Sequence, residues 1–102
     1  MANNNINKLG FEDWVIDNLK SDPELAQQYL DAAIKDFDED EDVSALLLSL
    51  KSVAKARGWT YLEKETGVSR QALYKALNED GNPRIRTFLN IINSLGYHLK
   101  IS

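Results

Sequence analysis

The chain has 102 residues, of which 43% are hydrophobic, and it contains no cysteine. This length suits one domain with a modest core, and the lack of cysteine excludes a disulfide framework or a thiolate metal site. No apolar run approaches the roughly 20 residues that cross a bilayer, and the start, MANNNINKLG, lacks the basic and apolar parts of a signal peptide. We therefore expect a cytoplasmic protein with a disordered lead-in over residues 1–10.

The formal net charge of −4 is divided unevenly along the chain. Residues 1–50 hold twelve acids and three bases, whereas residues 51–102 hold four acids and nine bases. A basic local field is what phosphate binding requires, so the second half could meet nucleic acid although the whole chain is acidic. The acidic half should lie away from a duplex or be covered by a basic partner.

Two helices are predicted in the acidic half. Residues Phe11–Leu19 carry apolar side chains about one turn apart, which predicts a short amphipathic helix. Ser21 and Glu24 have the spacing of a capping box, and Pro23 is tolerated in a first turn, so a second helix should run to residue 35 or 36. Its buried side is predicted to comprise Leu25, Leu30, Ala33 and Ile34. The acidic residues 36–42 are predicted to form a link.

A third helix is predicted from Val43 to residue 56 or 57, with Gly58 at its end. Its apolar residues recur at core spacing, so this helix should be the centre of the hydrophobic core. The set comprises Val43, Leu46, Leu47, Leu50, Val53 and Ala54.

The stretch TYLEKETGVSRQALYKAL, residues 60–77, has the pattern of a helix-turn-helix. Thr60 and Glu63 have the spacing of a capping box, which predicts a helix from Tyr61 to about residue 66. Gly67 provides the positive φ that often ends a helix. Ser69 is a good N-cap for the second helix.

The second helix of this motif has two distinct faces. Its inward face is predicted to comprise Ala72, Leu73, Ala76 and Leu77. Its outward face is predicted to comprise Arg70, Gln71, Tyr74, Lys75 and Asn78. Arginine can pair with guanine and glutamine with adenine, and the outward set contains no acid, so we interpret it as a recognition helix. The alternative is an ordinary helical hairpin.

The last part of the chain is predicted to contain a loop, a helix and a strand. Residues 79–83 are turn formers, and a helix should run from residue 84 or 85 to 94 or 95 before Gly96, burying Phe88, Leu89, Ile91, Ile92 and Leu95. Arg84 and Arg86 at its entrance could contact phosphates or lie in a solvated turn. Tyr97, Leu99 and Ile101 alternate with polar residues, which predicts a short strand.

The predicted strand requires a partner, because its backbone groups would otherwise form an open edge. The same strand from a second copy would build a two-fold dimer and set two recognition helices roughly 34 Å apart on DNA. Addition to another protein's sheet and a frayed tail are the alternatives.

Nearly the whole chain from Phe11 resembles the addiction-module antidote proteins, antitoxins with an XRE-like (Cro-type) helix-turn-helix. The resemblance rests on the acidic helical start, on VAKARGWTYL and on ETGVSRQALYKALNEDGNPRIRTFLNIINSLGYHLKI. It implies an all-α, lambda-repressor-like domain of five to six helices with a short C-terminal β-strand. It also implies a bacterial dimer that represses its own operon and neutralises a small basic toxin of the RelE or ParE type. One departure is Glu63, where the family usually has alanine, which puts the packing of the two helices in question.

The candidate sites follow from these observations. Residues 11–42 form an acidic helical region, and residues 43–102 form the helix-turn-helix domain with its strand. Candidate contacts to operator DNA are Thr60, Lys64, Ser69, Arg70, Gln71, Tyr74, Lys75, Asn78, Arg84 and Arg86. Candidate dimer contacts are Tyr97, Leu99 and Ile101. Candidate toxin contacts are Asp36, Asp38, Glu39, Asp40 and Glu41, although these acids could simply favour the N-terminus of the next helix.

No catalytic residue, metal site or cofactor is predicted. His98 is the sole histidine and has no cysteine or activated serine to pair with. The run DFDEDED lacks the central glycine and distant glutamate of an EF-hand. Two alternative functions stay open: a stand-alone phage-type regulator, and a protein-interaction module that does not bind DNA.

Overall fold

The computed structural model describes residues 8–78 and 82–97, with side chains from residue 13 onward, and these residues form six α-helices. The helices are α1 (Lys8–Ser21), α2 (Pro23–Asp40), α3 (Val43–Arg57), α4 (Trp59–Thr66), α5 (Arg70–Ala76) and α6 (Ile85–Ser94). The expected helical class is confirmed within this part of the chain, which holds no strand. None of its helices is long and apolar enough to cross a membrane.

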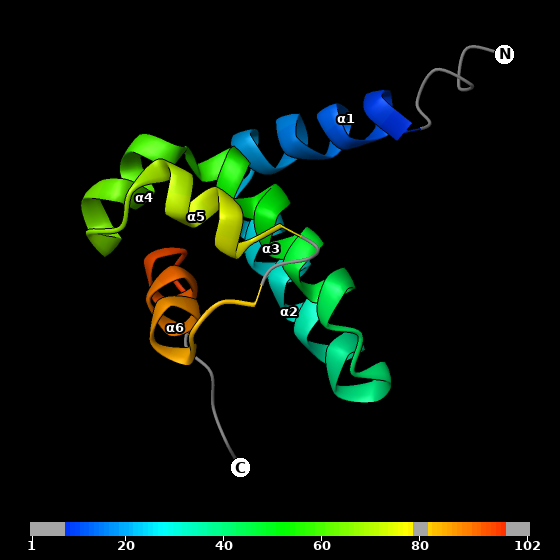
Figure 1. The fold of residues 1–102 in the computed structure, drawn as a ribbon. Coiled ribbons are helices and arrows are strands. Elements are labelled where there is room, and N and C mark those ends of the chain that lie inside the picture. Colours follow the sequence, from blue (N-terminus) through cyan, green and yellow to red (C-terminus); the bar gives the residue numbers. More distant parts are fainter. Residues whose placement is uncertain (1–7, 79–81, 98–102) are drawn as a thin grey trace, which may run out of the picture.

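The helices are arranged around a long antiparallel pair (Figure 1). Helices α2 and α3 lie side by side, and α1 packs on both of them. Helix α4 contacts α3, α5 and α6. Helices α4, α5 and α6 therefore gather at one end of the molecule. The turn between α2 and α3 projects at the opposite end. The fold therefore separates the helix-turn-helix from the most acidic stretch of the chain.

Helix α3 supplies the largest share of the buried core, as its pattern predicted. Its buried apolar residues are Leu46, Leu47, Leu50, Val53 and Ala54. They pack with fully buried side chains from the other helices, which include Leu30, Leu62, Leu73, Leu77, Ile91 and Ile92. A core shared by α2 to α6 holds the helix-turn-helix and the acidic pair in one body.

Some residues predicted to be buried are exposed instead. The set comprises Leu25, Val43, Ala72 and Leu89, and Trp14, one of the apolar side chains that predicted the first helix, is exposed as well. Helical spacing identifies the apolar side of a helix, but residues at the end or the margin of that side extend beyond the neighbouring helix. Val43, the first residue of α3, is 52% exposed for this reason.

The predicted capping and length of α2 were wrong. The N-cap is Asp22, whose side chain accepts a hydrogen bond from the Leu25 N–H at 3.1 Å, while Ser21 is the last residue of α1. The helix continues through most of the predicted link to Asp40. Phe37 packs against the core, and burying this aromatic side chain extends the helix into the acidic run. Helix α1 likewise begins three residues before its predicted start.

The joint between α4 and α5 differs from the predicted capping box. Helix α4 begins at Trp59 with Gly58 as its N-cap, and no side chain caps it. The Glu63 carboxylate instead accepts the Arg70 backbone N–H at 2.6 Å, across the turn. Gly67, at φ 73°, donates its N–H to the Glu63 carbonyl at 2.9 Å. Glu63 thus ties the end of α4 to the start of α5, which answers the packing question that its size raised.

Two backbone hydrogen bonds close the C-terminus of α6 at Gly96, which has φ 86°. The Gly96 N–H bonds to the Asn93 carbonyl at 3.0 Å, and the Tyr97 N–H bonds to the Ile92 carbonyl at 3.1 Å. Tyr97 packs against the core of its own chain, and its pKa is raised by burial and then by a hydrogen bond to Asp31. The remainder of the predicted strand, with Leu99 and Ile101, lies outside the described residues, so the strand stays a prediction.

Replacing Glu63 with alanine should lower the free energy of unfolding by about 1 to 2 kcal/mol, because the N-terminal donor of α5 loses a charged acceptor. Urea unfolding measures this change. Glu65→Ala is the matched control, since Glu65 is an exposed glutamate on the same helix. Equal destabilisation by both substitutions would show that the contact across the turn contributes nothing specific.

Candidate nucleic-acid interface

The outward face of α5 is exposed as the sequence predicted. The opposite face is fixed, because Leu73 and Leu77 are fully buried in the core. The exposed side chains are Arg70, Gln71, Tyr74, Lys75 and Asn78, and together with Trp59 they line one shallow hollow. Five candidate DNA contacts thus lie on one surface.

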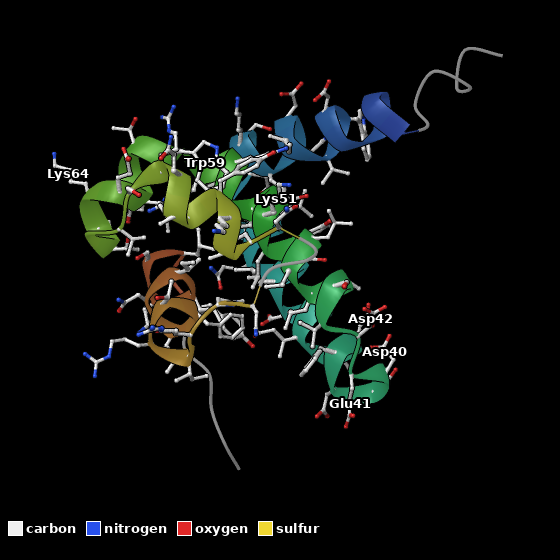
Figure 2. The ribbon with its side chains drawn as sticks, viewed as in Figure 1. Asp40, Glu41, Asp42, Lys51, Trp59 and Lys64 are labelled. Carbon is white, nitrogen blue, oxygen red and sulfur yellow. The ribbon has the colours of Figure 1, made fainter. Side chains whose placement is uncertain are left out.

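Tyr74 is held in place by two neighbours from other helices. Its ring meets the Trp59 ring edge-on, with 5.8 Å between centroids, and the Lys51 ammonium lies 4.5 Å from its centroid (Trp59 and Lys51 are labelled in Figure 2). Both are contacts of the kind that aromatic quadrupoles favour. Lys51 was not predicted as part of this surface, because helical spacing within α3 gives no sign that this side chain reaches α5.

The exposed side chains at the start of α5 differ in their hydrogen bonds. The Ser69 hydroxyl accepts the Ala72 N–H at 3.2 Å, so this side chain caps the helix as predicted. The Arg70 guanidinium donates to the Thr60 hydroxyl at 3.4 Å, which brings two candidate DNA contacts together. Gln71, one position further along, is exposed on the same surface.

Arg84, from the entrance of α6, joins the surface of α5. It lines a second hollow together with Lys75 and Asn78. Arg86 is exposed on α6 but does not line either hollow. Lys64 does not line them either, and it lies on α4 at a distance from Trp59 (Figure 2). Among the described residues that line these two hollows, none is acidic. The arrangement provides a positive, amide-bearing surface of the kind that nucleic acid requires.

The acidic turn lies at the opposite end of the molecule. Figure 2 shows Asp40, Glu41 and Asp42 at the turn between α2 and α3, far from Trp59 and Lys64. Each of the predicted toxin contacts at positions 36, 38, 39, 40 and 41 is exposed.

A local capping role accounts for part of this turn. Asp42 is the N-cap of α3 and accepts the Ala45 N–H at 3.1 Å, and the Asp40 carboxylate accepts the Asp42 N–H at 3.0 Å. Within residues 8–78 and 82–97, no group of three or more histidine, cysteine, aspartate or glutamate side chains could hold a metal ion. The acids of the turn therefore include helix caps but no described metal cluster.

Comparison with known proteins identifies the family. The model of a family described as "Probable addiction module antidote protein" matches residues 11–102. A protein of Haemophilus influenzae with the description "Uncharacterized protein" is 29% identical over 87 residues, which cover 85% of this chain and 84% of its own length. No solved structure matches the chain significantly. The family match spans well over half of the residues, and the chain therefore belongs to the family of probable addiction module antidote proteins.

Proposed function

We propose that the protein is the antitoxin of a type II toxin-antitoxin module. It binds its operator as a sequence-specific repressor of its own genes, and it neutralises a small basic toxin of the RelE or ParE type. An antidote acts by binding and not by catalysis, so no reaction is assigned to it. Family membership supports the antidote role. The surface that α5 shares with Arg84, where none of the described lining residues is acidic, is the observation that carries the DNA-binding role.

Helix α5 would lie in the major groove with its N-terminal residues at the base edges. Gln71 is the leading candidate base reader, because Arg70 is engaged by Glu63 through its backbone and by Thr60 through its guanidinium. Lys75 and Arg84, which line the same hollow beside the helix, would neutralise phosphates of the backbone. Trp59 and Lys51 would keep the Tyr74 ring in one orientation.

The repressor would act as a two-fold dimer, which matches the symmetry of a palindromic operator. The strand predicted over residues 97–101 remains the proposed dimer contact, with Leu99 and Ile101 as its apolar residues. Such a dimer would work in the bacterial cytoplasm and associate with the nucleoid when bound to DNA.

The acidic turn supports the second role. A toxin that acts on RNA carries positive charge, and exposed carboxylates at positions 36 and 38–41 would attract it and raise the association rate. Because the turn lies opposite the α5 surface, the toxin and the operator would occupy different ends of the antitoxin.

Gln71→Ala should cost about 1 to 3 kcal/mol of operator binding, as expected when a base contact is lost, while affinity for random DNA stays the same. The assay compares DNA from upstream of the protein's own gene with random DNA of equal length. Gln28→Ala, an exposed glutamine on α2, is the control and should leave both affinities unchanged. Undiminished operator affinity after Gln71→Ala would reject this residue as a base reader.

Arg84→Ala should weaken binding to all DNA sequences and lower the slope of log affinity against log salt by about 0.9, the value for one lost phosphate contact. Lys35→Ala removes an exposed charge from α2 and serves as the control. A slope that matches the wild-type value would place Arg84 away from the backbone. A protein that shows no salt dependence and no sequence preference would be an interaction module, contrary to the proposal.

Neutralising the acidic turn should slow toxin association by about tenfold and flatten its salt dependence, because long-range attraction is lost. The variant replaces Asp38, Glu39, Asp40 and Glu41 with the corresponding amides. Stopped-flow mixing with the small basic protein encoded beside this gene measures the rate. The control replaces Asp13 and Asp17, exposed acids of α1, in the same way. Equal rates and salt slopes would show that the turn is only a solvated connection.

A further inference from the structure

Two exposed apolar side chains meet at one hollow beside the acidic turn. Val43 at the start of α3 is 52% exposed and Ile85 at the start of α6 is 70% exposed. Both line a hollow of about 360 Å³, which is also lined by Ile34, Phe37 and Phe88. We call this the α2–α6 hollow. Single exposed apolar residues are ordinary, whereas an exposed pair around an apolar concavity is a feature that binding sites share.

Three acids are direct sequence neighbours of residues that line the α2–α6 hollow. Phe37 lies between Asp36 and Asp38 in α2, and Val43 directly follows Asp42. All three acids are exposed, and Figure 2 shows the α2–α3 turn with its carboxylates pointing outward at this end. A partner that enters the hollow from this side meets carboxylates around an apolar centre. This combination is complementary to a basic protein.

Two bases are the sequence neighbours of Ile85 on the α6 side of the hollow, although neither of them lines it. Arg84 and Arg86 flank Ile85, but Arg84 also lines the second hollow beside Lys75, on the α5 side. Three acids and two bases are sequence neighbours of the lining residues, and the whole chain has a formal net charge of −4, so a second copy would be repelled more than a basic partner. We therefore commit to a basic partner.

We propose that the α2–α6 hollow is the docking site of a basic protein, which inserts an apolar side chain between Phe37, Val43 and Ile85. The lysines or arginines of that protein meet the carboxylates of the α2–α3 turn. The inference rests on the proposed function, in which this partner is the toxin. Exposed ion pairs contribute little to affinity, whereas a buried apolar side chain at the centre of an interface contributes much. The acids thus set the association rate, and the hollow sets the dissociation rate.

The test uses the full chain with Val43→Lys or Ile85→Lys, which place a charge in the hollow. Each variant should bind the small basic protein encoded beside this gene at least about tenfold more weakly, mainly through faster dissociation. Leu48→Lys is the matched control, because Leu48 lies on α3 and is 49% exposed outside the hollow. It should change the affinity by less than about twofold. Unchanged operator binding and unfolding midpoints verify that each variant is folded, and Val43→Ala provides a milder second variant.

Three results would overturn the inference. If the wild type binds the toxin and both lysine variants bind it equally well, the toxin occupies another surface and only this inference fails. If the wild type does not bind the toxin, the antitoxin role and the inference fail together. If the wild type sediments as a dimer without toxin and Val43→Lys converts it to a monomer, the hollow holds a second copy instead.

Discussion

The hydrogen bond between the Glu63 carboxylate and the Arg70 backbone N–H joins the two helices on which the proposed DNA surface depends. The first backbone N–H groups of a helix lack partners inside that helix, so an acceptor from a neighbouring element fixes where the helix begins. Glu63 provides this acceptor from α4, while Leu73 and Leu77 bury the inner side of α5. With its start and its inner face fixed, α5 has one orientation, and its acid-free face lies outward.

The long α2–α3 pair explains how one small domain can offer two surfaces of opposite charge. A carboxylate cluster next to α5 would reduce its affinity for phosphates over a distance of about 8 Å at physiological salt. The extended helical pair holds the α2–α3 turn at the far end of the molecule (Figure 1). The acids can therefore attract a basic partner without opposing DNA at α5. The α2–α6 hollow is lined by Phe37 and Val43 from the two helices that the turn joins, and in the proposed complex it would supply the apolar contact that charges alone lack.

Local sequence signals predicted the helix-turn-helix well, and contacts between distant residues were the main part that they missed. Gly67 and Ser69 fulfil their predicted roles because a positive φ and an N-cap depend on neighbouring residues only. The predicted capping partner of Glu63 was wrong. Its spacing to Thr60 suggested a hydrogen bond within α4 and gave no sign of the hydrogen bond to the start of α5. The position of Lys51 over Tyr74 depends on the packing of α3 against other helices, which no spacing within either segment reveals.

The central claim is that the outer face of α5 lies in a groove of operator DNA. The natural chain contains no cysteine, so Gln71→Cys would place a single thiol on this face for attachment of a DNA-cleaving iron chelate. The account predicts cleavage confined to the operator, at two positions about one helical turn of DNA apart if the protein binds as a two-fold dimer. The same chelate at Glu39→Cys, on the α2–α3 pair, should give no local cleavage. Cleavage that is absent from the Gln71→Cys protein, or that both proteins give alike, would contradict the account.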